Sequence, residues 1–82
     1  RKLAGKGRYA VQVASVRDRS AAEAAAARVR SEGFEALTVM VSLKGKTWYR
    51  IRTGRFPSKQ AAAKAAGIFS SAYGFKAIAV QD

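Results

Sequence analysis

The sequence predicts an α+β domain in which four strands and two helices follow one another as βαββαβ, with an antiparallel sheet and both helices on one of its faces. Three observations indicate this fold. Residues Tyr9–Val16 and Tyr49–Phe56 alternate with a period of two, which is typical of a half-buried strand. An alanine-rich segment with apolar residues at helical spacing follows each of them. The two halves of the chain also repeat one another.

The internal repeat is visible when the chain is shifted by forty residues. Tyr9 then falls on Tyr49, and Val11 falls on Ile51. The apolar positions of the two helical segments also superimpose: Ala22, Ala25, Ala26 and Val29 on Ala62, Ala65, Ala66 and Phe69. Two strand–helix–strand halves joined by a hairpin give the βαββαβ order. Right-handed crossovers then place the first and third strands at the centre of the sheet.

In the first half, Ser20 is the predicted N-cap of the helix, because Ser20 and Glu23 have the spacing of a capping box. Gly33 suits the left-handed residue that ends such a helix. Apolar and β-branched residues predict the second strand at Ala36–Leu43. The turn Lys44-Gly45-Lys46 then leads into the third strand as an antiparallel hairpin.

In the second half, the third strand is predicted at Trp48–Thr53, and Gly54 and Pro57 mark the turn that follows it. Ser58 is the predicted N-cap of the second helix. Gly74 ends this helix, and Phe75–Val80 is the predicted fourth strand.

Length and charge indicate one small domain with an anionic partner. The chain has 82 residues, begins with Arg1 and carries a formal net charge of +11. We expect a flexible basic tether at residues 1–8, a folded domain at residues 9–82, and a longer parent protein. The charge favours nucleic acid, anionic lipid or an acidic wall polymer, with solubility alone as the alternative. No apolar run is long enough for a signal peptide or membrane span.

Catalysis has little support in the composition. There is no histidine and no cysteine, so thiol chemistry, disulfides and thiolate metal sites are excluded. The acidic residues are scattered over predicted loops and helix ends: Asp18, Glu23, Glu32, Glu35 and Asp82. No nucleophile–base pair or metal-ligand spacing occurs. We therefore expect a protein that is not an enzyme and uses no cofactor.

Alternation predicts which side chains the sheet face without helices carries. On the two central strands these are Ala10, Gln12, Ala14, Trp48, Arg50 and Arg52. On the outer strands they are Thr38, Met40, Ser42 and, if Phe75 points inward, Lys76, Ile78 and Val80. Trp48 offers a flat apolar plate, Gln12 a donor and an acceptor, and the arginines fixed donor forks. This combination suits a sugar ring.

Each of these residues also has a structural interpretation. Trp48 could belong to the core near the hairpin, and Gln12 could be a solvated sheet residue. Arg50 and Arg52 could protect against edge-to-edge pairing, although a central strand does not need this. Ser15 lies beyond the regular alternation, so the pattern does not fix its direction.

The segments YAVQVASV and WYRIRTGRFPSKQAAAKAA, with a helix, a Gly-Phe pair and a strand between them, resemble the SPOR domain of bacterial cell-envelope proteins. The family pattern has Tyr-x-Val-Gln-hydrophobic-x-Ser-Phe in the first strand. Its third strand has hydrophobic-Arg-hydrophobic-x-x-Gly-x-Phe, followed by an alanine-rich helix. The resemblance extends from Tyr9 to Val80. Two positions depart from it: Ala14, where many members carry glycine, and Thr53, where an aliphatic residue is usual.

The resemblance implies a ferredoxin-like fold and a noncatalytic module that binds peptidoglycan glycan strands stripped of their stem peptides, as found at the division septum. Gln12 and Ser15 match the first-strand contacts of the family, and Trp48 matches an aromatic residue that some members carry on the third strand. Arg50, Arg52 and Ile78 are added from their strand parity. The lactyl carboxylate of muramic acid would supply the anionic charge.

For the intact cell, the resemblance implies a location in the bacterial cell envelope, in the periplasm or on the cell-wall side. We expect a monomer that has no membrane contact of its own. Two other functions remain open at this point. RNA-recognition domains share the βαββαβ order, but the third strand KTWYRIRT lacks their aromatic signature, so we expect only weak, nonspecific nucleic-acid binding. The same face could also hold a protein partner.

Overall fold

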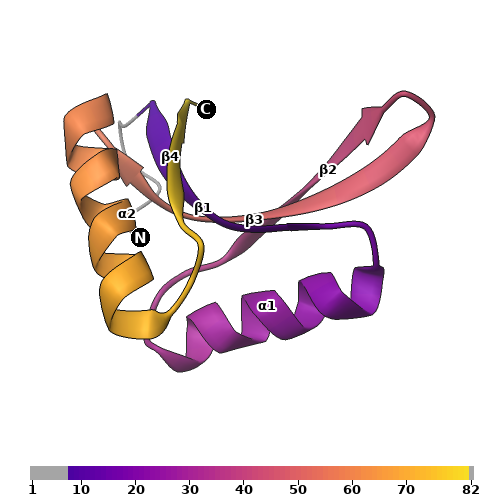
Figure 1. Cartoon of the computed structure of the whole chain (residues 1–82), viewed down its shortest axis with the longest axis horizontal. Coiled ribbons are helices and arrows are strands. Elements are labelled where there is room, and N and C mark those ends of the chain that lie inside the picture. Colours follow the sequence, from indigo (N-terminus) through magenta and orange to yellow (C-terminus); the bar gives the residue numbers. More distant parts are fainter. Residues whose placement is uncertain (1–7, 82) are drawn as a thin grey trace.

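The structure, a computed structural model, describes residues 8–81 and has the predicted order of elements (Figure 1). The elements are β1 (Tyr9–Val16), α1 (Arg19–Ser31), β2 (Leu37–Leu43), β3 (Lys46–Phe56), α2 (Lys59–Tyr73) and β4 (Ile78–Gln81). The strands form an antiparallel sheet in the order β2-β3-β1-β4, so β1 and β3 are central as the repeat predicts. Apart from Arg8, the predicted tether lies outside the described residues.

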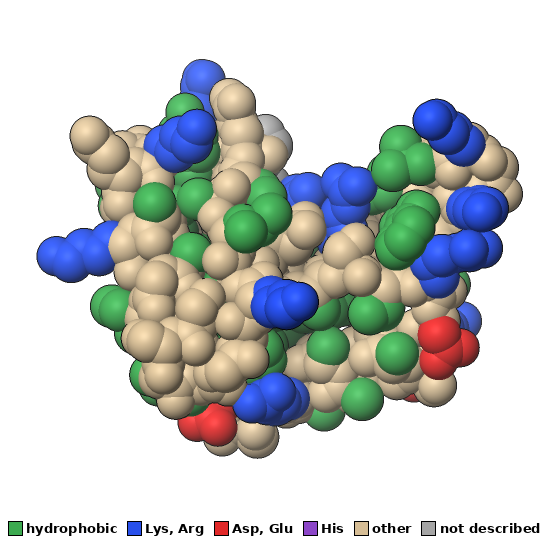
Figure 2. Space-filling model, viewed as in Figure 1, with side chains coloured by type: hydrophobic (Ala, Val, Ile, Leu, Met, Phe, Trp, Pro, Cys, Tyr) green, Lys and Arg blue, Asp and Glu red, His purple; other side chains and the backbone are tan. Residues whose placement is uncertain are grey.

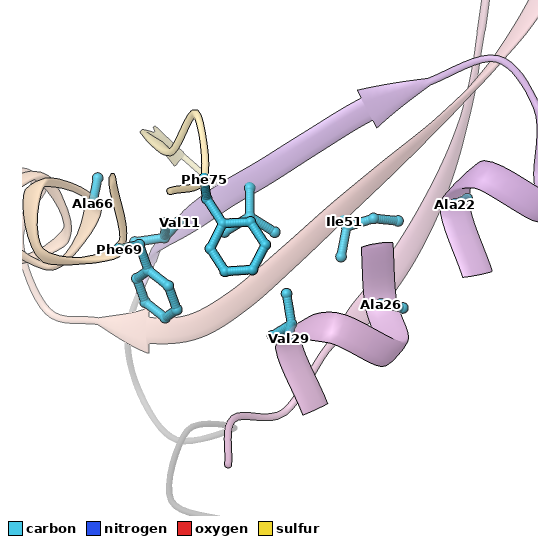
Figure 3. Packing of buried hydrophobic residues seen from close by; sticks show 9 residues of the cluster. Val11, Ala22, Ala26, Val29, Ile51, Ala66, Phe69 and Phe75 are labelled. Carbon is cyan, nitrogen blue, oxygen red and sulfur yellow. The ribbon is translucent and has the colours of Figure 1, made fainter. Parts of the chain in front are cut away.

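The core lies between the two helices and one face of the sheet. Ile51, Val11 and Val29 are the largest side chains that are fully removed from solvent. Figure 3 shows Ile51 pointing from β3 towards α1, while Val11 lies near the rings of Phe69 and Phe75. The helices contribute mainly alanines to this interface, including Ala22, Ala26, Ala62 and Ala66. Such small side chains let both helices lie close to the sheet, and this compensates for a core of few large residues.

The start of α1 differs from the prediction. Asp18, not Ser20, is the N-cap: its carboxylate accepts the Ala21 amide at 3.0 Å and the Ser20 hydroxyl at 2.7 Å. Glu23 does not reach back to the cap. It forms an ion pair with Arg19, one turn earlier, with 3.6 Å between Glu23 Oε2 and Arg19 Nε. A carboxylate caps a helix better than a hydroxyl here because it accepts both hydrogens at once, so the helix begins one residue before the serine.

Both helices end near a left-handed glycine, as the repeat predicts, although the C-cap of α1 is Glu32 and that of α2 is Gly74 itself. Gly33 and Gly74 have positive φ angles of 92° and 76°, which glycine adopts without strain. The phenylalanine after each glycine turns back onto the core. Measured between ring centroids, Phe34 lies 4.8 Å from Phe69, and Phe75 lies 6.1 Å from Phe69. One aromatic side chain of α2 therefore joins the two chain reversals.

The last strand is shorter than predicted. The sequence predicts a strand at Phe75–Val80, but β4 begins only at Ile78. Phe75 is buried in the core, and the Ala77 amide donates to the Ser70 hydroxyl at 3.2 Å, so this segment is held by α2 and not by the sheet. The inward direction of Phe75 agrees with the prediction.

The short β4 leaves part of β1 without a neighbour on one side. β4 pairs with Tyr9–Gln12, so the outer edge of β1 from Val13 to Val16 has no strand beside it. A hollow of about 510 Å³ lies there, bounded by this edge, by α1 and by residues 74–76. We call it the β1 notch.

Replacing Ile51 by alanine tests the core. Ile51 is fully buried, so Ile51→Ala is expected to lower the free energy of unfolding by about 2 to 5 kcal/mol, because both the transferred apolar surface and the filled volume are lost. Urea denaturation followed by circular dichroism measures this change. Ile68→Ala is the matched control: Ile68 is 55% exposed, and its replacement should change stability by less than about 0.5 kcal/mol. Equal losses in the two variants would contradict the described core.

The Asp18 cap predicts a specific dependence of stability on pH. The hydrogen bond from the Ser20 hydroxyl, followed by that from the Ala21 amide, lowers the pKa of Asp18 below its usual value of 3.8. A lowered folded-state pKa stabilises the fold above the unfolded pKa, and this stability is lost as the pH falls through the folded pKa. Asp18→Asn keeps a capping oxygen but does not titrate. The urea midpoint of this variant should therefore fall less than that of the wild type between about pH 5 and about pH 2. Identical pH profiles would refute this role of Asp18.

Candidate functional site

The pairing of the strands brings the predicted site residues to one face. In β1 and β3, Gln12 lies opposite Arg52, and Ser15 lies opposite Arg50. Ile78 of β4 lies opposite Gln12 on its other side. Residues directly opposite one another in antiparallel strands project to the same face, and Trp48 shares that face because it precedes Arg50 by two positions. All six predicted residues therefore lie on the face away from the helices, which we call the open face.

A β-bulge in β1 gives Ser15 its direction. The register shifts between Gln12 and Ala14, so that β1 contains one extra residue relative to β3. Ala14 lies opposite the buried Ile51 and packs against the core, as Val13 does. The bulge reverses the parity of the strand beyond this point and returns Ser15 to the open face. The prediction that Ala14 lies on the open face is wrong for this reason.

The prediction for β2 is also wrong. Thr38, Met40 and Ser42 lie opposite Ile51, Tyr49 and Thr47, on the side of the helices. The open face instead carries the aliphatic residues of β2: Leu37, Val39, Val41 and Leu43. Burial does not decide the parity here, because the far half of β2 extends beyond the helices and Met40 is 67% exposed even on their side (Figure 1). The open face is consequently more apolar than predicted.

The fourth strand agrees with the predicted parity. Ile78 and Val80 lie on the open face, opposite Gln12 and Ala10. Lys76 precedes β4 and lines the β1 notch. Ile78 is 54% exposed, so an apolar side chain stands next to the Gln12 amide where a ligand can contact both.

One end of the open face is hollowed around Trp48. This Trp48 hollow, of about 490 Å³, is lined by Ser15, Leu43, Lys44, Lys46, Trp48 and Arg50. The indole is half-buried, and the guanidinium carbon of Arg17 lies 5.8 Å from its ring centroid, which is a cation–π distance. The lining contains three cations and no carboxylate. Figure 2 shows basic side chains gathered over the end of the β2–β3 hairpin. The site thus combines an aromatic plate, a hydroxyl and positive charge.

The sequence pattern does not single out Arg17, Lys44 and Lys46 as site residues. Only the folded hairpin brings its turn lysines beside Trp48 and Ser15. Lys44 and Lys46 precede Trp48 closely in the sequence, and this proximity could have predicted that they belong to the site.

Arg50 and Arg52 of β3 lie half-buried along the middle of the open face. The Nε atom of Arg50 is shielded from solvent and has no hydrogen-bond partner within the described residues. A shielded donor of this kind costs free energy until a partner reaches it. Arg52 lines a second hollow of about 500 Å³ together with Leu37, Glu35 and Arg55. Arg50 and Arg52 therefore lie between the Trp48 hollow and this second hollow.

Other kinds of site find no support within residues 8–81. No group of three or more histidine, cysteine or acidic residues that could hold a metal ion occurs there. None of the described helices is both long and apolar enough to cross a membrane.

Comparison with known protein families identifies the family of the chain. The family model of the SPOR domain matches residues 5–81. The chain belongs to the SPOR domain family. SPOR domains are noncatalytic modules that bind peptidoglycan, which associates the chain with the bacterial cell wall and envelope. No curated protein matches the chain in sequence.

Solved structures share the fold. The SPOR domain of RlpA from Pseudomonas aeruginosa has a TM-score of 0.72 at 17% identity, over 90% of this chain and 99% of that one. The peptidoglycan-binding domain of the B. subtilis cell wall lytic enzyme CwlC has a TM-score of 0.68 at 23% identity, over 100% and 98%. A Burkholderia pseudomallei protein described as exported has a TM-score of 0.70 at 24% identity, but this chain spans only 15% of it. These likenesses show the fold.

Proposed function

We propose that the open face binds glycan strands of peptidoglycan that have lost their stem peptides, and that the domain thereby carries its parent protein to the division septum. The observation behind this proposal is the grouping of Gln12, Ser15, Trp48 and Arg50 on one uncovered sheet face. The domain acts as a monomer, without membrane contact of its own, in the periplasm or on the cell-wall side.

The geometry suits a chain of amino sugars. Trp48 presents an aromatic surface for the CH-rich face of a pyranose ring, and such a contact needs no charge. The Gln12 amide and the Ser15 hydroxyl can each donate to and accept from hydroxyl and acetamido groups. Val39 and Ile78 supply apolar contact on either side of the central strands. A linear polymer can therefore use the face along its length.

The positive charge favours glycan without peptide. The basic residues that line the open face and the β1 notch give the domain an excess of donors with fixed positive charge. Removal of a stem peptide converts the lactyl amide of muramic acid into a carboxylate. Each such carboxylate adds a charge-assisted hydrogen bond that the peptide-substituted sugar cannot form. A bulky stem peptide would also have to avoid the side chains that surround Trp48.

Sedimentation with sacculi tests the proposal. The wild-type domain should bind amidase-treated sacculi, which carry naked glycan, more strongly than untreated sacculi. Trp48→Ala and Gln12→Ala should each weaken this binding by about tenfold or more, because hot-spot aromatic and buried polar contacts contribute most of a binding energy. Bound and free protein in the pellet and supernatant give the measurement.

Met40→Ala is the matched control, because Met40 is exposed on the other face of the same sheet. This variant should bind amidase-treated sacculi like the wild type. Equal binding to treated and untreated sacculi would contradict the preference for naked glycan. Wild-type binding by both Trp48→Ala and Gln12→Ala would remove the open face from the mechanism.

Nucleic-acid binding is the competing function that the net charge of +11 favours. Among the described strands, however, Trp48 is the one aromatic residue on the open face, since Tyr49 points to the helices. A base-stacking platform of the RNA-recognition type uses aromatics on both central strands.

A salt titration separates the two functions. Phosphate contacts release counterions, so oligonucleotide affinity should fall by at least about tenfold between about 50 mM and 200 mM salt. Binding to naked glycan should change by no more than about threefold over the same range, because the lactyl carboxylates contribute only part of the affinity and stacking and neutral hydrogen bonds contribute the rest. Fluorescence of the single tryptophan reports both titrations. Tight, sequence-dependent oligonucleotide binding at the higher salt would favour the competing function.

A further inference from the structure

The β1 notch has its own polar chemistry, which the binding of sugar rings on the open face does not use. Two basic residues line it, Arg28 from α1 and Lys76 from the segment before β4, and no carboxylate is among the lining residues. Figure 2 looks onto this side of the molecule, where the surface is hollowed between β4 and α1 and basic side chains stand at the margin. The notch therefore favours an anionic group.

Arg28 is held in place by contacts to the second half of the chain. Its Nη2 donates to the backbone carbonyl of Tyr73, the last residue of α2. Its guanidinium carbon lies 4.6 Å from the centroid of the buried Phe75 ring. A guanidinium has five N–H donors, so one bond to a carbonyl leaves others for a ligand. A side chain fixed in this way loses less conformational entropy when it binds an anion.

The notch is continuous with the open face. Gln12, Ser15 and Ile78, which project to the open face, also line the notch, while Val13, Ala14 and Val16 line it from the side of the helices. The hollow thus passes around the free edge of β1 from one side of the sheet to the other. A ligand that contacts Gln12 and Ser15 can extend a side group over this edge towards Arg28.

We propose that the β1 notch is a carboxylate subsite, in which Arg28 and Lys76 receive the lactyl carboxylate of a muramic acid residue bound at Gln12 and Ser15. This inference rests on the proposed glycan function. It assigns the discrimination between naked and peptide-bearing glycan to the edge of β1, and not to the arginines of β3. The lactyl ether is a short branch with a terminal carboxylate, so it can leave the plane of the sugar chain where β4 leaves room. When a stem peptide is attached, this group is a neutral amide and the charge pair is absent.

Matched oligosaccharides test this subsite. The probes are a peptide-free tetrasaccharide of alternating N-acetylglucosamine and N-acetylmuramic acid, and the same tetrasaccharide with each lactyl carboxylate converted to a primary amide. The amide has nearly the same size and no charge. Tryptophan fluorescence or calorimetry gives both affinities. The wild type should bind the carboxylate form about fivefold more tightly, as a partly exposed ion pair allows. Arg28→Gln and Lys76→Gln should each reduce this ratio, and the double variant should bring it close to one.

The amide form supplies the baseline for every variant, since it measures the sugar contacts alone. Affinity for the amide should stay within about twofold in Lys76→Gln, because Lys76 is exposed and the amide carries no charge for it to pair with. If Arg28→Gln unfolds, Arg28→Lys and Lys76→Gln carry the test, and Arg28→Lys should retain part of the preference. Lys64→Gln is the charge control, because Lys64 is exposed on α2 and lines none of the hollows described above.

The outcomes separate this inference from the proposed function. If the wild type binds both tetrasaccharides equally, or if the preference survives the Arg28→Gln/Lys76→Gln double variant, the carboxylate subsite is refuted while glycan binding stands. Loss of the preference in Arg50→Gln, with retention in both notch variants, would place the carboxylate on the open face and refute the notch. Absence of binding to either tetrasaccharide would refute glycan recognition itself.

Discussion

The pairing of β1 with β3 decides to which face of the sheet the side chains of the two central strands point. Each strand supplies the core from one parity and the open face from the other, so a single register sets both. The bulge after Gln12 is part of that register, because it sends Val13 and Ala14 to the helices and Ser15 to the opposite side. Stability and recognition therefore share the same backbone hydrogen bonds, and the side chains of the two faces remain separate.

The alanine-rich helices determine which face stays open. Both pack on the side of Val11 and Ile51, and their small side chains let them lie close enough to close the core with few large residues. No helix remains for the other side of the sheet within the described chain. The polar and aromatic residues on that side are consequently available to a ligand. Positive charge is distributed over both the β2–β3 hairpin and the β1 notch.

The central strands of the fold follow from local sequence, and the outer strands do not. Alternation in Tyr9–Val16 and the forty-residue repeat were sufficient to place Gln12, Arg50 and Trp48 together. The direction of Ser15 depends on a β-bulge, which inserts one extra residue into β1. The residue types around the bulge do not reveal it. β2 shows the opposite difficulty, because an edge strand that overhangs its helices has no burial to fix its parity.

The predicted ends of helices and strands were wrong where neighbouring side chains compete for the same role. Asp18 and Ser20 are both good caps, and only the geometry of two simultaneous hydrogen bonds selects the aspartate. Phe75 has a high strand propensity, but its burial beside Phe69 removes it from the sheet and delays β4 to Ile78. That delay opens the β1 notch, so strand propensity alone did not predict the hollow that Arg28 and Lys76 line.

The strand order makes the two halves of the repeat depend on one another. In the order β2-β3-β1-β4, the two strands of the first half are not neighbours, and neither are the two strands of the second half. Phe34 of the first half likewise completes its aromatic contacts only with Phe69 and Tyr73 of the second. A solitary half would have a helix and two strands but no sheet. A half of this length could therefore complete its sheet only as a twofold-symmetric pair, in which each copy supplies the neighbouring strands of the other.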